Sequence, residues 1–141
     1  MTKTKSGLEQ LHVLLGSWVT ESKRYSEGRG FTTITPTEDG EFLRVDSTAE
    51  DERFPHSTQI IGSDEAGDEC TALYFDSRGV HRVYRMRVTD GVWRMWRDAP
   101  GFNQRYVGKI GEDGKTITGQ WEMSEDGKQW HVDFDLSYRK Q

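Results

Sequence analysis

The sequence has little cysteine, little proline and no long apolar run. Among its 141 residues there are one Cys and three Pro, and the single Cys70 can form neither an intramolecular disulfide nor a multi-cysteine zinc site. No apolar run reaches the roughly 18 residues of a membrane-spanning helix. The polar start, Met1 to Lys5, is not followed by the apolar stretch of a signal peptide. We therefore expect a cytoplasmic protein with no membrane partner.

Apolar residues are also scarce. With Gly counted and Tyr left out they make up about 40% of the chain, against roughly 45 to 50% in typical globular proteins. The formal net charge of -5 disfavours binding to the phosphate backbone of a nucleic acid, so no nucleic-acid partner is expected. Aromatic residues are plentiful, with 5 Trp, 5 Tyr and 6 Phe, and such residues supply large buried areas. We expect one domain over residues 1–141, with 1–6 as a flexible tail and a core built on aromatic rings.

Helical periodicity is confined to the start of the chain. Ser6 and Glu9 form a capping-box pattern, and Leu8, Leu11 and Leu15 share one helical face, which predicts a short helix from Gly7 to Leu15. Beyond it the period is two, and turns interrupt it at Asp39-Gly40, Gly67, Ser77 to Gly79, Asp90-Gly91, Asp113-Gly114 and Asp126-Gly127.

The turns divide the rest of the chain into about ten strands. We place them at Ser17–Tyr25, Phe31–Pro36, Glu41–Thr48, His56–Ser63, Glu69–Asp76, Val80–Thr89, Val92–Arg97, Phe102–Ile110, Lys115–Met123 and Gln129–Arg139. No segment between them could form a crossover helix, so the strands must pair as an antiparallel meander, and so many strands need closure to remove exposed edges. The predicted fold is all-β, a closed up-and-down antiparallel barrel capped by the short N-terminal helix.

Alternation along the strands assigns the inward face. The inward sets are Trp130, Val132, Phe134, Leu136 and Tyr138; Ile117, Gly119, Trp121 and Met123; Phe102, Gln104, Tyr106 and Ile110; and Val80, Arg82, Tyr84, Met86 and Val88. In Val92–Arg97 both alternating sets contain apolar residues, Trp93 with Met95 and Val92 with Trp96, so the inward set is ambiguous. The second set would carry Arg94 inward.

The inward arginine indicates where a ligand could bind. A buried unpaired charge is costly, so Arg82 must either meet an anionic ligand or pair with an acid such as Asp76 at the barrel rim. Around it, amphipathic aromatic side chains would give apolar walls with a few polar groups, the usual composition of a ligand pocket. The candidate ligand-binding residues are Trp18, Tyr74, Arg82, Tyr84, Gln104, Tyr106, Trp121 and Tyr138. The alternative is that these aromatic side chains simply fill the barrel.

Other chemistry has weaker support. The four histidines lie in separate elements without metal-ligand spacing, so no metal site is expected. Arg85, Arg87 and Arg105 should face outward as a basic stripe, either to contact an acidic partner or RNA, or to pair with acids on neighbouring strands. A barrel enzyme of isomerase or cyclase type, with Tyr and Arg as acid and oxyanion partner, leaves no sequence motif and stays open.

Three segments carry a family resemblance: Leu14 to Trp18 after the helix, Tyr74 to Gly79 in mid-chain, and Asp126 to Trp130 before Tyr138-Arg139. They resemble an uncharacterised family of bacterial lipocalin-like (calycin-type) proteins, distantly similar to fatty-acid-binding proteins and nitrobindins. The resemblance implies a small antiparallel barrel that carries a hydrophobic molecule. We expect no cofactor. Nitrobindins bind haem through a His on the last strand, and His131 is the matching position, although alternation turns it outward.

The sequence therefore favours non-catalytic binding of a small hydrophobic or amphipathic ligand with an anionic head inside the barrel. Haem binding through His131 and the barrel enzyme are the alternatives. A homodimer is left open.

Overall fold

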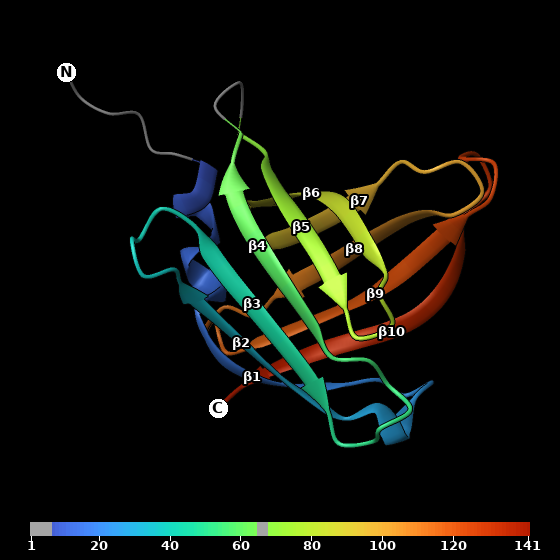
Figure 1. Ribbon diagram of the computed structural model, residues 1–141, viewed down its shortest axis with the longest axis horizontal. Helices are drawn as coiled ribbons and strands as arrows, with labels where there is room; N and C mark the ends of the chain where they lie inside the picture. Colours follow the sequence, from blue (N-terminus) through green and yellow to red (C-terminus); the bar gives the residue numbers. More distant parts are fainter. Residues whose placement is uncertain (1–6, 65–67) are drawn as a thin grey trace.

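The computed structural model describes residues 7–64 and 68–141 and shows a closed barrel of ten antiparallel strands (Figure 1). The strands are β1 (Gly16–Glu21), β2 (Gly30–Pro36), β3 (Leu43–Ala49), β4 (Ser57–Ser63), β5 (Cys70–Asp76), β6 (His81–Thr89), β7 (Val92–Arg97), β8 (Asn103–Ile110), β9 (Thr116–Ser124) and β10 (His131–Lys140). Each strand pairs with its neighbours in sequence, and β1 pairs with β10 to close the sheet. The predicted fold is confirmed. The capping-box residue Ser6 and the predicted tail lie outside the described residues.

One end of the barrel is covered by the helix η1 (Gly7–Leu14), at the left of Figure 1. It is a 3-10 helix, which has three residues per turn, so Leu8, Leu11 and Leu14 fall on one face and all three are buried. The sequence predicted a helix that ends at Leu15 and has Leu15 on the buried face. Both details were wrong, because Leu14 takes this place in a 3-10 helix. We call this end of the molecule the closed end.

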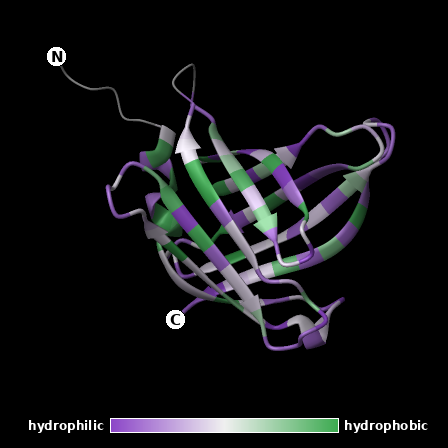
Figure 2. Cartoon of the chain, in the orientation of Figure 1, coloured by the Kyte–Doolittle hydropathy of each residue, from purple (hydrophilic) through white to green (hydrophobic). Residues whose placement is uncertain are grey.

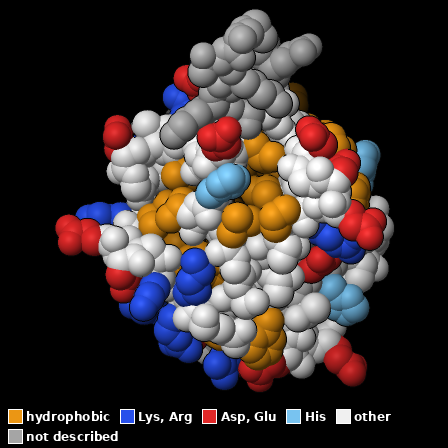
Figure 3. Space-filling model, turned by 90° about the vertical axis from the view of Figure 1, so that its left-hand side faces the viewer, with side chains coloured by type: hydrophobic (Ala, Val, Ile, Leu, Met, Phe, Trp, Pro, Cys, Tyr) orange, Lys and Arg blue, Asp and Glu red, His pale blue; other side chains and the backbone are white. Residues whose placement is uncertain are grey.

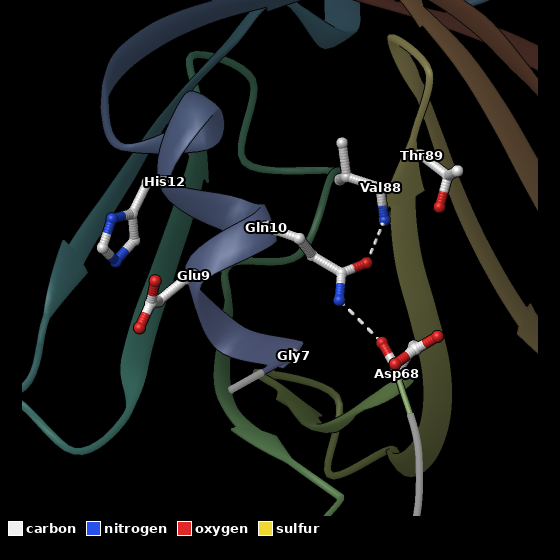
Figure 4. Close-up of a pocket in the computed structure, with 7 residues that line it drawn as sticks. All are labelled: Gly7, Glu9, Gln10, His12, Asp68, Val88 and Thr89. Atoms are coloured by element: carbon white, nitrogen blue, oxygen red, sulfur yellow. Dashed lines mark hydrogen bonds between the residues drawn. The ribbon is translucent and has the colours of Figure 1, made fainter. Parts of the chain in front are cut away.

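The side-chain amide of Gln10 fixes η1 to the barrel. Its Nε2 donates to the carbonyl oxygen of Asp68 at 2.6 Å, and its Oε1 accepts from the backbone N–H of Val88 at 2.7 Å (Figure 4). Figure 3 views the closed end directly and shows hydrophobic side chains gathered among charged ones. Val13 of η1 and Phe42, before β3, are exposed there.

The alternation of polar and apolar residues along the strands is visible in Figure 2. Gln104 and Tyr106 on β8 and Ile117 on β9 are buried, as predicted. On β7 the structure decides between the two competing parities: Trp93 and Met95 are buried and Arg94 is exposed. Arg94 therefore does not face the interior, and Arg97 shares the inward parity of Trp93.

The last strand breaks its alternation. Between Val132 and Phe134 the register of β10 against β9 shifts by a β-bulge, and Val132 is 50% exposed. The prediction that Val132 faces inward was wrong, because the extra residue of a bulge turns the side chains before it to the other face.

Loops at the end opposite η1, which we call the open end, are held by carboxylates. Asp135 accepts from the backbone N–H groups of Lys23 and Arg24 and from the hydroxyl of Ser22. This contact holds the segment between β1, which ends at Glu21 and not at the predicted Tyr25, and the helix η2 (Ser26–Gly28). No helix in the described part of the chain is both long and apolar enough to span a membrane.

Candidate ligand-binding site in the barrel

Five inward-facing polar side chains gather at the open end, where β5 and β7 end and β6 and β8 begin. We call Tyr74, Arg82, Tyr84, Arg97 and Gln104 the mouth cluster. The hydroxyl of Tyr84 donates to Gln104 Oε1 at 2.9 Å, and Arg97 Nη1 donates to the same oxygen at 3.3 Å. Arg82 Nη1 lies 3.5 Å from the Tyr84 hydroxyl, and the rings of Tyr74 and Tyr84 meet edge to face.

Neither arginine of the mouth cluster forms an ion pair with a carboxylate of residues 7–64 or 68–141. Asp76, considered above as the partner of Arg82, is instead paired with Arg78 at 2.7 Å and accepts a hydrogen bond from Tyr74 at 2.7 Å. The contact with Arg78 lowers the pKa of the Asp76 carboxyl well below its usual range. The only ring that Arg82 faces among the described residues is Phe102, at 5.3 Å.

The mouth cluster can therefore bind an oxyanion. Two guanidinium groups converge on one hydroxyl–amide pair, and Arg presents a planar set of N–H donors that fits carboxylate and phosphate oxygens. Both arginines contact only neutral groups in the described structure, so their charges are available to a ligand. Sequence reasoning missed Arg97, because the parity of β7 was ambiguous; the buried pair Trp93 and Met95 would have placed it.

An aromatic column runs from the mouth cluster toward the closed end. Successive ring contacts, with centroids 5.3 to 6.3 Å apart, join Tyr84, Trp121, Tyr106, Trp93, Tyr138 and Trp18. Burial raises the pKa of Tyr74, Tyr106 and Tyr138, so their phenols stay protonated at neutral pH.

Tyr106 is seated on two glycines. A Cβ at Gly108 or Gly119 would meet the Tyr106 side chain at 2.6 Å, and one at Gly119 would also collide with the Val107 carbonyl oxygen. The ring fills the space that the two missing side chains leave, and its hydroxyl donates to the Leu136 carbonyl oxygen at 2.9 Å. These contacts fix Tyr106 across the interior of the barrel.

Below the mouth cluster the barrel encloses a cavity of about 40 Å³. It is lined by Leu14, Thr32, Ile34, Val45, Ser47, Gln59, Ile61, Met86, Trp93, Met95, Tyr106, Trp121 and Tyr138. Typical ligand pockets occupy about 300 to 1,000 Å³, so the aromatic side chains fill most of the interior that the strand number led us to expect as open space.

The structure thus divides the eight predicted site residues into three groups. Tyr74, Arg82, Tyr84 and Gln104 belong to the mouth cluster, whereas Tyr106, Trp121 and Tyr138 line the enclosed cavity. Trp18, the last ring of the aromatic column, lines neither site; it is fully buried at the closed end, with its Nε1 donating to the Leu14 carbonyl oxygen at 2.8 Å. Arg97, Gln59 and Trp93 were not among the predicted residues.

Haem does not fit this arrangement. His131 begins β10 at the open end, is exposed and does not line the cavity. The predicted outward parity was wrong, because the bulge that turns Val132 outward gives His131 the parity of its partner Met123, which pairs with the inward Gln104. A cavity of about 40 Å³ is far smaller than the pockets of drug-sized ligands, and a haem would displace the aromatic column. Among the described residues, no three His, Cys, Asp or Glu side chains gather as a metal site.

The outward arginines have mixed partners. Arg85 lies near Asp64 and Glu69, and Arg105 pairs with Glu122 at 2.9 Å while stacking over Trp130. The alternative that these arginines pair with acids on neighbouring segments therefore holds for both. Arg87 forms no ion pair with a carboxylate of the described residues, and its cross-strand partner is Arg94.

A surface hollow of about 420 Å³ is open to solvent, unlike the enclosed pockets that bind most small ligands. It lies between η1 and β6, and Figure 4 shows Gln10 crossing it toward Val88 and Asp68. Both polar atoms of the Gln10 amide already form hydrogen bonds that hold η1. The amide therefore offers a ligand no free hydrogen-bonding atom in this hollow, in contrast to the arginines of the mouth cluster.

Comparison with known proteins assigns the chain to no family. Neither a scan against protein-family models nor a search of curated proteins finds a match to the chain. The lipocalin-like resemblance of its sequence segments therefore stays a prediction, and what the structure shows is the closed ten-stranded barrel itself.

Proposed function

We propose that this protein binds a small amphipathic anion, with the acidic head at the mouth cluster and the apolar part against the aromatic column, and that it does not convert this ligand chemically. One observation carries the proposal: Arg82 and Arg97 point inward at the same Tyr84–Gln104 pair, and neither forms an ion pair within the described residues. Two adjacent cations without a counter-charge favour an anionic ligand, because it neutralises both.

The raised pKa values of the interior tyrosines support binding over catalysis. A general acid works best when its pKa lies near the working pH, whereas burial moves those of Tyr74, Tyr106 and Tyr138 away from neutrality.

Native mass spectrometry of the purified protein, compared with its denatured mass, tests the proposal first. We expect a retained acidic molecule that is lost in Arg82→Ala, with the circular dichroism spectrum of the parent unchanged. Arg105→Ala, which removes an outward arginine of the neighbouring surface, is the matched control and should retain the molecule.

An adduct that survives both Arg82→Ala and Arg97→Ala would show that the mouth cluster does not bind the head group. An adduct with the mass and absorption of haem would overturn the proposal in favour of the His131 alternative. Where no adduct is retained, titration with carboxylates of graded chain length decides, and a protein that binds none of them is not a carrier of this class.

A further inference from the structure

Two buried polar atoms of the enclosed cavity have no hydrogen-bond partner in the described structure. They are Gln59 Oε1, an acceptor, and Trp93 Nε1, a donor. Trp93 is only 6% exposed, so solvent does not satisfy its N–H. Buried polar groups in native proteins are nearly always paired, and an unpaired one costs stability. A donor and an acceptor left free in the same cavity therefore point to an occupant with both functions.

A hydroxyl pair in the cavity wall adds a further free group. The Thr32 and Ser47 hydroxyl oxygens are 2.9 Å apart, and both residues line the cavity. When two hydroxyls bond to each other, one donates and the other keeps its proton for a different partner. The deep part of the barrel is thus able to form several hydrogen bonds and is not a purely apolar tail pocket.

The volume limits what can enter. A cavity of about 40 Å³ holds about three water-sized groups at roughly 10 to 15 Å³ each. This is room for the polar end of a molecule, such as a hydroxyl, and not for an alkyl chain.

The sheet register places this polar end relative to the mouth cluster. Gln59 on β4 pairs with Tyr74 on β5, and Tyr74 pairs with Arg82 on β6. The Gln59 and Arg82 backbones are therefore two strand spacings apart, about 10 Å. Tyr84 of the mouth cluster and Trp121 of the cavity wall have ring centroids 5.7 Å apart, and aromatic side chains favour an aromatic partner.

We infer that the enclosed cavity is a second binding subsite, specific for a hydroxyl group, and that the ligand is a small aromatic hydroxy acid. Its carboxylate meets Arg82 and Arg97, and its hydroxyl accepts from Trp93 Nε1 and donates to Gln59 Oε1. This inference rests on the proposed function for the acidic head, but the hydroxyl subsite is defined by different residues and can be tested apart from it.

The test compares acids that differ by one hydroxyl. Binding of 3-(4-hydroxyphenyl)propanoate and 3-phenylpropanoate is measured by calorimetry on the parent protein and on Trp93→Phe, Gln59→Met and Arg97→Gln. We expect the hydroxy acid to bind about tenfold more tightly to the parent, since the analogue leaves buried polar groups unpaired. The preference should fall to near unity in Trp93→Phe and Gln59→Met, whereas Arg97→Gln should weaken both acids equally.

Phenol and toluene, which lack the acidic head, separate the two proposals. If neither acid binds but phenol binds in preference to toluene and loses this preference in Gln59→Met, the hydroxyl subsite stands and the head-group proposal fails. If the two acids bind the parent equally, or the preference survives both deep substitutions, the subsite does not exist and the cavity holds only water. If neither acid binds and phenol binds no better than toluene, both the head-group proposal and the hydroxyl subsite are wrong. Gln59→Met keeps the test valid if Trp93→Phe disturbs folding, because it changes the side-chain volume little.

Discussion

Replacing Arg97 by Gln should make the unliganded protein more stable while it weakens anion binding. Arg97 and Arg82 contact a Tyr84–Gln104 pair whose oxygens are 2.9 Å apart, and no described carboxylate pairs with either. Their charges therefore repel each other in the free protein. The substitution leaves no acceptor unpaired, because Gln104 Oε1 still accepts from the Tyr84 hydroxyl.

The size of the gain follows from the distance. The three contacts place the two Nη1 atoms no more than about 10 Å apart, where two unit charges repel by about 0.4 kcal/mol in water and about 1.7 kcal/mol at an effective dielectric constant of 20. Both side chains are half-buried, so we expect Arg97→Gln to raise the free energy of unfolding by about 0.5 to 1 kcal/mol at low salt.

Urea denaturation at low ionic strength and in about 1 M NaCl, where the screening length is about 3 Å, provides the measurement. The gain should shrink in high salt. Arg105→Gln is the control with the opposite sign, because it breaks the Glu122 ion pair and the stacking over Trp130 and should lower stability by about 0.5 to 1.5 kcal/mol. If Arg97→Gln destabilises the protein at both salt concentrations, Arg97 is a structural residue and our assignment of an unpaired charge is wrong.

Three further predictions concern the barrel itself. Gly119→Ala should lower the free energy of unfolding by about 2 to 4 kcal/mol in urea denaturation, because the new methyl group overlaps Tyr106 and a backbone oxygen; a loss below about 0.5 kcal/mol would contradict that packing. Since Arg78 depresses the pKa of the Asp76 carboxyl, the stability it supplies is present above the ordinary Asp pKa and is lost as the pH falls below about 4; Asp76→Asn should flatten the acid limb of a pH–stability profile. Burial raises the pKa of the Cys70 thiol to about 11, so a thiol reagent at pH 8 should label the native protein only at the rate of unfolding, and rapid labelling would refute its burial.

Much of the barrel could be predicted because its strands follow local rules. The Asp-Gly turns mark the hairpins, and the period-two alternation gives the inward faces of β8 and β9, including Gln104 and Tyr106. Closure follows from the same pattern, since consecutive hairpins without a crossover helix leave two edges that must meet. Arg82 was also found this way, as a charged residue on an otherwise apolar face.

The failures occurred where local pattern does not determine geometry. One extra residue in β10 forms a bulge that exposes Val132, and alternation cannot reveal where a bulge lies. The two parities of β7 contain similar apolar residues, so only pairing with β6 and β8 could place Arg97 inward.

The sequence by itself determined the strand positions, the closed barrel and an arginine directed into it, because turn chemistry and side-chain alternation act over a few neighbouring residues. Tertiary structure alone decided that Asp76 pairs with Arg78, that Arg97 joins Arg82, and that Gln59 Oε1 and Trp93 Nε1 line one cavity without a hydrogen-bond partner among the described residues. These facts depend on the three-dimensional distance between side chains from different strands. That distance is set by register and packing across the barrel, and no local sequence pattern encodes it.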